Sequence, residues 1–358
     1  MYNALKGSIL VLVREMNKVY YKEEIVQNTD YREQYIATLD EFLAEEHKRA
    51  AKKRDFMNPK KYIKNAEKYR KLFVEFLGFP LNIKNVKPKL VEKKFVSQDG
   101  NVNIYRMQFL FFDKIKFYGI WFEQIEDARE KPFVIGLHGG GGTPEMVSSM
   151  HLESANYNHL VRRATDRGAN VFAPQLYLWE VEKYGNAYDR MKTDAKCRQL
   201  GGSITALELR ILQGCIDYFL EDGMNESQVG VVGLSYGGLY SLYLAALDDR
   251  IKACYSSNWV CDSFTFPMYD WSFLNAEKRF SIAETAGLIC PRSLVVSMGD
   301  KDFLFPFKET EKECLKIIEY YKEYGCVDQF KLVIFDGDHE FNKKNDEYDF
   351  FFSKLKAG

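Results

Sequence analysis

The segment Gly233-Leu234-Ser235-Tyr236-Gly237 has the form G-x-S-x-G, which can present a serine hydroxyl as a nucleophile. A strand-like run at 229–232 precedes it, and an apolar run of helical character follows at 239–247. The two glycines lack the Cβ atoms that would collide where a strand turns abruptly into a helix. Such a turn exposes the hydroxyl at a helix N-terminus, where the helix dipole favours developing negative charge. The pattern predicts Ser235 as a nucleophile.

A serine hydroxyl is a weak nucleophile and needs a base within hydrogen-bonding distance. The chain has five histidines, and only His339 follows Ser235. It stands just after a strand-like run at 330–335, so we expect it at the same edge of the sheet as the serine. The order serine, acid, histidine is the one found where a strand–serine–helix turn carries the nucleophile. His339 is therefore the predicted base.

The base needs a carboxylate that holds one tautomer and stabilises the imidazolium. The segment Gly299-Asp300-Lys301-Asp302 follows the penultimate strand-like run and offers two candidates. We favour Asp302, because the apolar residues after it can bury it beside the imidazole, whereas Asp300 suits a turn cap or a pair with Lys301. Asp336 and Asp338 are local alternatives, but they stand close to His339 in sequence.

Acyl transfer also needs hydrogen-bond donors for the oxyanion. The run His138-Gly139-Gly140-Gly141-Gly142 follows a strand-like segment and lets backbone N–H groups turn into a site. We expect the amide of Tyr236 and one amide from Gly139 or Gly140 to form the hole. A phosphate-binding loop is disfavoured because the G-x-x-x-x-G-K-[ST] form is absent. His138 is expected to shape this loop, with a substrate contact left open.

Strand-like runs alternate with helical patterns over most of the chain, which predicts a mostly parallel α/β sheet with helices on both faces. The strand-like runs are 91–95, 104–111, 116–123, 132–137, 169–173, 229–233, 251–256, 292–297 and 330–335. The first three are expected to be antiparallel, with Asp99-Gly100 as a hairpin turn. The helical patterns are 154–167, 203–220, 307–324 and 346–356.

Residues 1–88 differ from the rest, because they are poor in glycine and carry apolar residues at helical spacing, such as Tyr35, Leu39 and Leu43. We predict an N-terminal helical extension of two to four helices packed on the core, followed by a catalytic domain at 89–358. The helices end at Leu77-Gly78-Phe79-Pro80, a helix stop signal.

A long aromatic-rich insertion at 258–289 is expected to serve as a lid and, with the N-terminal helices, to wall the pocket. Trp179, Trp259 and Trp271 are candidates for stacking on a sugar ring. Packing in the core or lid is the alternative for these tryptophans.

These motifs together resemble the α/β-hydrolase superfamily, and within it they are similar to the dienelactone-hydrolase and acetyl-xylan-esterase-like branch. The resemblance rests on the Ser235 segment, the glycine run at 138–142, the aspartate at 300 or 302 and Asp338-His339-Glu340-Phe341, and it covers roughly residues 90–356. It implies a serine hydrolase fold and no cofactor. Dienelactone hydrolases use a cysteine nucleophile, so the serine here implies ester chemistry.

The net charge and the cysteine pattern bear on the classes of partner and cofactor that the protein uses. The net charge of −1 gives no argument for nucleic acid or an anionic membrane as a partner. Seven scattered cysteines without a C-x-x-C pair predict free thiols rather than a disulfide framework or a zinc site. No metal or organic cofactor is expected. The apolar run at 8–13 is too short for a signal or a membrane span, so a soluble cytoplasmic protein is predicted.

The predicted function is hydrolysis of small-molecule carboxylic esters through an acyl-enzyme, with acetylated sugars or small esters as candidate substrates. A peptidase or amidase with the same residues is the first alternative. The sequence Ser-Tyr-Gly-Gly at 235–238, at the predicted turn, also occurs in prolyl-oligopeptidase-type peptidases. Only about 90 residues precede the catalytic part here, which is too few for the propeller domain of those enzymes. A catalytically silent binding module is the second alternative.

Overall fold

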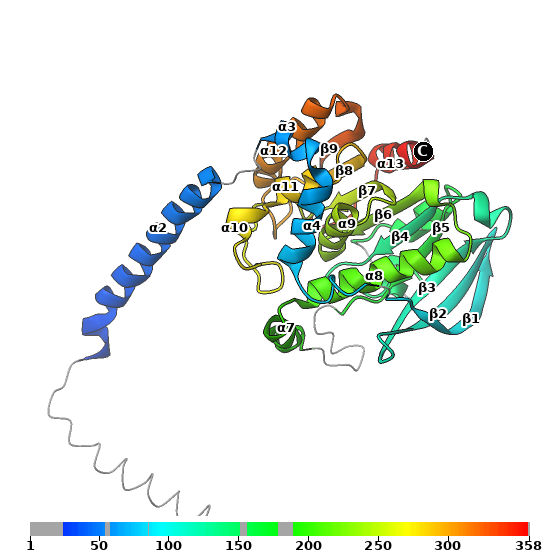
Figure 1. Ribbon diagram of the computed structural model, residues 1–358, viewed down its shortest axis with the longest axis horizontal. Coiled ribbons are helices and arrows are strands. Elements are labelled where there is room, and N and C mark those ends of the chain that lie inside the picture. The colour runs from blue at the N-terminus through cyan, green and yellow to red at the C-terminus, as the bar shows by residue number, and fades with distance from the viewer. Residues whose placement is uncertain (1–23, 54–57, 85, 151–155, 178–188, 357–358) are drawn as a thin grey trace, which may run out of the picture. The chain divides into compact units, whose positions relative to one another are not determined.

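A computed structural model describes residues 24–53, 58–84, 86–150, 156–177 and 189–356 (Figure 1). The chain divides into two compact units, Met1–Lys53 and Arg54–Gly358. In the first unit, η1 (Ile25–Asn28) leads into the long helix α2 (Thr29–Lys53). The division therefore follows α2, whereas the composition of the sequence suggested a boundary near residue 88. Helices α3 (Pro59–Lys64) and α4 (Ala66–Leu77) belong to the second unit.

The second unit is built on one sheet, which has nine strands in the described residues, in the order β1-β2-β3-β5-β4-β6-β7-β8-β9. The strands are β1 (Lys89–Asp99), β2 (Val102–Phe111), β3 (Ile115–Gln124), β4 (Phe133–Leu137), β5 (Asn170–Pro174), β6 (Val229–Leu234), β7 (Ile251–Ser257), β8 (Ser293–Gly299) and β9 (Phe330–Phe335). Strands β1, β2, β3 and β5 pair antiparallel in that order, and all further pairs are parallel. The predicted mostly parallel sheet is confirmed.

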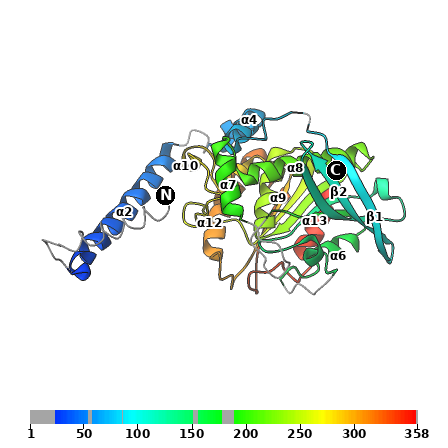
Figure 2. The same ribbon diagram turned by 90° about the horizontal axis from the view of Figure 1, so that it is seen from below.

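Helices cover both faces of this sheet, as Figure 2 shows for α8 on one side and α6 and α13 on the other. The further helices are α5 (Pro144–Val147), α6 (Leu160–Thr165), α7 (Arg190–Gln199), α8 (Ile204–Glu221), α9 (Tyr236–Leu247), α10 (Ala276–Arg279), α11 (Ile282–Gly287), α12 (Phe307–Tyr324) and α13 (Asp346–Lys356). Short 3-10 turns are η2 (Ala128–Glu130), η4 (Glu226–Gln228) and η5 (Val327–Gln329). None of the helices in the described residues is both long and apolar enough to cross a membrane.

The core forms on both faces because side chains alternate along each buried strand. Val231 packs into the cluster under α4, α8, α9, α11 and α12, while its neighbour Val232 packs into the cluster under α5, α6 and α13. Helix α4 joins the first cluster through Phe73, whose ring contacts those of Tyr243 and Phe280 at centroid distances of 5.6 and 5.1 Å. Residues 59–77 are thus part of the core of the second unit.

The structure adds two features that the sequence prediction did not give. Segment 258–289 contains the short helices α10 and α11. Helix α7 has almost no apolar face, since only Arg190 and Asp194 among its residues are buried, and hydrophobic periodicity therefore gave no signal for it.

Candidate active site

Ser235 lies on a strained turn between β6 and α9. Its backbone has φ of 59° and ψ of −120°, a conformation that non-glycine residues adopt at some cost. A Cβ on Gly233 would overlap the backbone of Gly237, and a Cβ on Gly237 would overlap the carbonyl of Leu137 at the end of β4. The Ser235 N–H donates to the Ser257 carbonyl on β7 at 2.8 Å, which ties the turn to the neighbouring strand. These contacts explain why glycines flank the serine on both sides.

His339 follows β9, and its Nδ1 lies 2.7 Å from Oδ2 of Asp302, which follows β8. The Asp302 side chain is fully buried and that of His339 is 10% exposed. With the carboxylate on Nδ1, the other ring nitrogen, Nε2, is left to face a reacting group. Ser235 and His339 both line one cavity, so the structure brings together the residues that the sequence singled out.

Asp302, rather than Asp300, is the carboxylate that reaches the histidine. Asp300 is exposed, and its Oδ1 accepts the Gly337 N–H at 3.2 Å. Lys301 forms its ion pair with Asp336 and not with Asp300.

Four donors surround the buried Asp302 carboxylate. Oδ1 accepts the N–H groups of Leu304 and Phe305 at 2.8 and 3.0 Å, and Oδ2 accepts Asn258 Nδ2 at 2.8 Å in addition to His339. Burial alone would raise the pKa of Asp302, but the hydrogen bond and charge of His339 and the two backbone donors hold it below the usual value. The carboxylate is therefore ionised at neutral pH.

Asn258 is a residue that the sequence reasoning did not single out. It is fully buried with a positive φ of 49°, and besides Asp302 it donates to the carbonyl of Asp338 at 3.2 Å. It thus holds the acid and the histidine loop together. An asparagine at the end of a strand, which tolerates positive φ, is the only sequence signal that could have marked it.

The glycine run after β4 lies against the serine. A Cβ on Gly139 would stand 3.2 Å from the Cβ of Ser235, and Gly139, Gly140 and Gly141 all line the cavity. The Gly139 N–H donates to the hydroxyl of Tyr157 at 2.7 Å, whereas no hydrogen bond joins the Gly140 N–H to the described residues. The buried Tyr157, which was not singled out from the sequence, thus accepts the hydrogen bond of the Gly139 N–H, one of the two N–H groups expected to bind the oxyanion.

His138 is a structural residue and does not line the cavity. Its side chain is fully buried, its Nδ1 donates to the Gly139 carbonyl at 2.9 Å and its Nε2 accepts the Leu176 N–H at 3.0 Å. Burial lowers the pKa of His138 to about 4. The sequence analysis left open a substrate contact by His138. The structure corrects this expectation, because both ring nitrogens are bonded to backbone groups.

The cavity that holds Ser235 and His339 has a volume of about 570 Å³, and its outer wall is mostly apolar. That wall comprises Trp259, Phe266, Pro267, Met268, Trp271, Leu304 and Phe305. Segment 258–289 thus walls the pocket, as expected. No residue of α3 or α4 lines it, which corrects the expectation for these N-terminal helices. Trp179 lies outside the described residues.

Trp259 and Trp271 pack edge to face, with ring centroids 4.4 Å apart, and Trp259 is almost fully buried. Phe305 contacts both indoles and the ring of His339, with a centroid distance of 5.9 Å to the imidazole. The tryptophans form part of the aromatic packing that surrounds the histidine as well as part of the cavity wall.

Sequence comparison places this site in a known family. The profile of the dienelactone hydrolase family matches residues 150–354, which is more than half of the chain. The chain belongs to the dienelactone hydrolase family. The matched range includes Ser235, Asp302 and His339 and excludes the glycine run at 139–141. A further relative, "Putative hydrolase YtaP" of Bacillus subtilis (strain 168), is 25% identical over an alignment 221 residues long, which covers 56% of this chain and 71% of that protein.

Solved structures share the fold of this family member at low sequence identity. A glucuronoyl esterase from Solibacter usitatus superposes with a TM-score of 0.62 at 15% identity, covering 81% of this chain and 92% of that chain. A "putative acetyl xylan esterase" from Bacteroides fragilis NCTC 9343 superposes with a TM-score of 0.64 at 15% identity, covering 83% and 84%. The α/β-hydrolase fold predicted from the sequence is confirmed by these neighbours.

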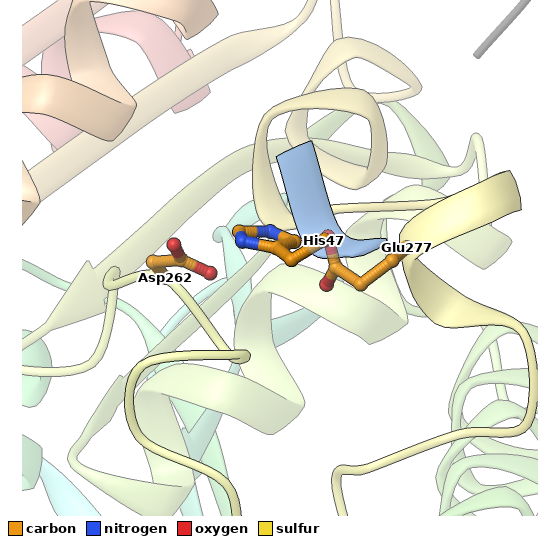
Figure 3. A group of neighbouring side chains, drawn as sticks. All are labelled: His47, Asp262 and Glu277. Atoms are coloured by element: carbon orange, nitrogen blue, oxygen red, sulfur yellow. The ribbon is translucent and has the colours of Figure 1, made fainter. Parts of the chain in front are cut away.

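Figure 3 draws the side chains of His47, Asp262 and Glu277, which all carry atoms of metal-ligating type. His47 lies in α2 of the first unit, and the two carboxylates lie in the second. The two units are not placed relative to one another, so this group gives no argument for a metal site.

We predict that Asp302→Asn lowers kcat for hydrolysis of an activated ester by at least about 100-fold, because the amide favours the wrong tautomer of His339. Asp300→Asn is the matched control: it is exposed, two residues away, and retains an oxygen for the Gly337 N–H. It should remain within about twofold of the wild type. Equal, mild losses in both variants would contradict the assignment of the acid.

We also predict a pH-dependent contribution of His138 to stability. Its pKa is about 4 in the folded protein against 6.5 in the unfolded chain, so protons bind preferentially to the unfolded state. The stabilisation is fully present above pH 6.5 and is lost as the pH falls toward 4. Between pH 7 and 5, the wild type should lose about 2 kcal/mol more unfolding free energy than His138→Gln, measured by urea denaturation. Equal losses would show that His138 titrates normally.

Proposed function

We propose that this protein is a serine carboxylic-ester hydrolase that works through an acyl-enzyme. The observation that carries the proposal is the placement of Ser235, on its strained turn, in one cavity with His339, whose Nδ1 is bonded to the buried Asp302. Membership of the dienelactone hydrolase family supports a hydrolase, and a serine in place of the cysteine of dienelactone hydrolases supports ester substrates.

In the first half of the reaction, His339 Nε2 accepts the proton of the Ser235 hydroxyl as the oxygen attacks the acyl carbonyl. Asp302 holds the imidazole with Nδ1 protonated and stabilises the imidazolium that forms. The proton then passes from His339 to the departing alkoxide, and the acyl group remains on Ser235. In the second half, His339 takes a proton from the water that attacks the acyl-enzyme, and it passes this proton to Ser235 Oγ as the acid is released.

The negative charge that develops on the carbonyl oxygen needs donors that are already in place. Tyr236 begins α9 directly after the serine, so its amide is one donor. We assign the second donor to the Gly140 amide, because the Gly139 N–H is bonded to the Tyr157 hydroxyl. This assignment narrows the choice between Gly139 and Gly140 that the sequence left open.

The cavity wall supports a neutral acyl group. The described residues that line the cavity include no Asp, Glu, Lys or Arg side chain, and the aromatic and aliphatic wall favours apolar contact. A volume of about 570 Å³ exceeds what an acetyl group fills, so simple esters of longer acids are supported alongside acetylated sugars. For the sugars, Trp259 and Trp271 supply apolar wall rather than an open stacking face, because the two residues are only 1% and 5% exposed.

The test is a substrate panel on the wild type and on Ser235→Ala. The panel contains p-nitrophenyl acetate, butyrate and octanoate, an acetylated xylo-oligosaccharide and an aminoacyl p-nitroanilide. We expect turnover of the esters, and a loss of at least about 1000-fold in kcat in Ser235→Ala. Ser353→Ala, an exposed serine on α13, is the control and should keep wild-type activity.

Other outcomes would overturn this proposal in distinguishable ways. Faster turnover of the anilide than of every ester would indicate an amidase. Ester hydrolysis that persists in Ser235→Ala would show that the reaction does not pass through an acyl-enzyme on Ser235. A wild type that neither hydrolyses the panel nor reacts with a fluorophosphonate at Ser235 would indicate a binding module.

A further inference from the structure

A buried polar cluster lies directly behind the proposed oxyanion donor. It consists of Arg190 on α7, Glu208 on α8, Tyr236 and Tyr240 on α9, and Asp270 in the connection between β7 and β8, and we call it the Arg190 cluster. Each of its side chains is less than a tenth exposed. Burying one cation with two carboxylates costs desolvation energy unless every charge is paired and hydrogen-bonded. The catalytic steps proposed above do not use these ionisable side chains.

On one side, the Arg190 cluster holds the side chain of Tyr236. The Tyr236 hydroxyl donates to the carboxylate of Asp270, with distances of 3.0 Å to Oδ1 and 2.8 Å to Oδ2. Arg190 Nε donates to the same Oδ2 at 2.6 Å, and the guanidinium lies 5.6 Å from the centroid of the Tyr236 ring. The hydroxyl and the ring of Tyr236 are therefore both fixed from outside α9.

On the other side, the guanidinium is anchored to two helices. Arg190 Nη1 donates to Glu208 Oε2 at 3.0 Å, and Nη2 donates to the Tyr240 hydroxyl at 2.8 Å. The Tyr240 hydroxyl and the Tyr177 N–H donate in turn to Glu208. Arg190 thus bridges the two carboxylates, and its position is set by α8 and α9 together.

The lid residue in the Arg190 cluster is fixed through its backbone as well. The Asp270 carbonyl accepts the Thr205 hydroxyl of α8 at 2.8 Å, and Arg198 of α7 donates to the carbonyls of Tyr269 and Ser272 on either side of it. The next residue, Trp271, lines the cavity and contacts the Tyr236 ring at a centroid distance of 5.2 Å. The same short segment therefore shapes the cavity wall and grips Tyr236.

The contacts of the Tyr236 side chain bear on the position of its backbone amide, which is a proposed oxyanion donor. An oxyanion donor has to be held within a few tenths of an ångström of its productive position before the charge develops. We propose that the Tyr236 hydroxyl, gripped by Asp270 and Arg190, is a positioning group that fixes the Tyr236 amide for the oxyanion. The inference rests on the proposed function. In this proposal, Tyr236 contacts segment 258–289 through its hydroxyl and the oxyanion through its amide.

The first test compares Tyr236→Phe with Tyr243→Phe. Both remove one hydroxyl from a buried tyrosine of α9, but only Tyr236 belongs to the Arg190 cluster. Rates are divided by the number of active sites titrated with a fluorophosphonate, so that misfolded protein does not count. We expect kcat of Tyr236→Phe to fall about tenfold with KM within twofold of the wild type, because the lost interaction acts only in the transition state. Tyr243→Phe should match the wild type.

A transition-state analogue gives a second readout that a general loss of structure would not move. The Ki of a boronic acid should rise in Tyr236→Phe by the same factor by which kcat/KM falls, since both report binding of the tetrahedral oxygen. Asp270→Ala should show a loss at least as large, because it removes both the acceptor of the Tyr236 hydroxyl and a partner of Arg190. The double variant should lose no more than Asp270→Ala alone, because the contact that Tyr236→Phe removes is then already absent.

Two results would overturn this inference while leaving the proposed function intact. One is a Tyr236→Phe variant with wild-type kcat per titrated site, and the other is a loss that falls on KM with the boronic acid Ki unchanged. Failure of the proposed function is separate, because it would appear as ester hydrolysis that persists in Ser235→Ala.

Discussion

The close approach of three backbone segments at the end of β6 is the constraint on which the site depends. Gly233, Gly237 and the carbonyl of Leu137 lie so near one another that no Cβ fits between them. This contact forces the chain to turn at Ser235 with positive φ, and α9 begins at the next residue. The serine, the first amide of the helix and the glycine run after β4 are consequently held together by backbone packing. Side-chain contacts then refine what the backbone has placed.

The ionised groups of the site are stabilised by donors that come from neighbouring strand ends. Asp302 is buried but accepts hydrogen bonds from His339, Asn258 and two backbone N–H groups, which keep its pKa low despite the desolvation. Near Tyr236, the buried charge of Arg190 is likewise compensated, by ion pairs with Glu208 and Asp270. Charge is therefore buried on both sides of the serine, once to orient the base and once, in our proposal, to orient the oxyanion donor.

Local patterns were enough to predict the sheet and the main elements of the site. Each strand-like run corresponds to a strand, and helix α12 has the predicted bounds, because buried strands and amphipathic helices leave clear periodic signals. Asn258 and Tyr157 were missed, since each acts through a contact outside its own local pattern, with a residue 44 and 18 positions away in the sequence, respectively. Arg190 was missed for a related reason: its burial depends on carboxylates on two other segments, and a charged residue on a polar helix usually indicates a solvated face.

The most direct measurement of the central claim is a crystal structure of the protein after reaction with a p-nitrophenyl alkylphosphonate. The account predicts one phosphorus atom bonded to Ser235 Oγ, with its anionic oxygen about 2.7–3.1 Å from the amide nitrogens of Tyr236 and Gly140. The alkyl chain should lie against the wall formed by Met268, Trp271 and Phe305. A phosphorus atom bonded to another residue, or an anionic oxygen directed away from both amides, would contradict it.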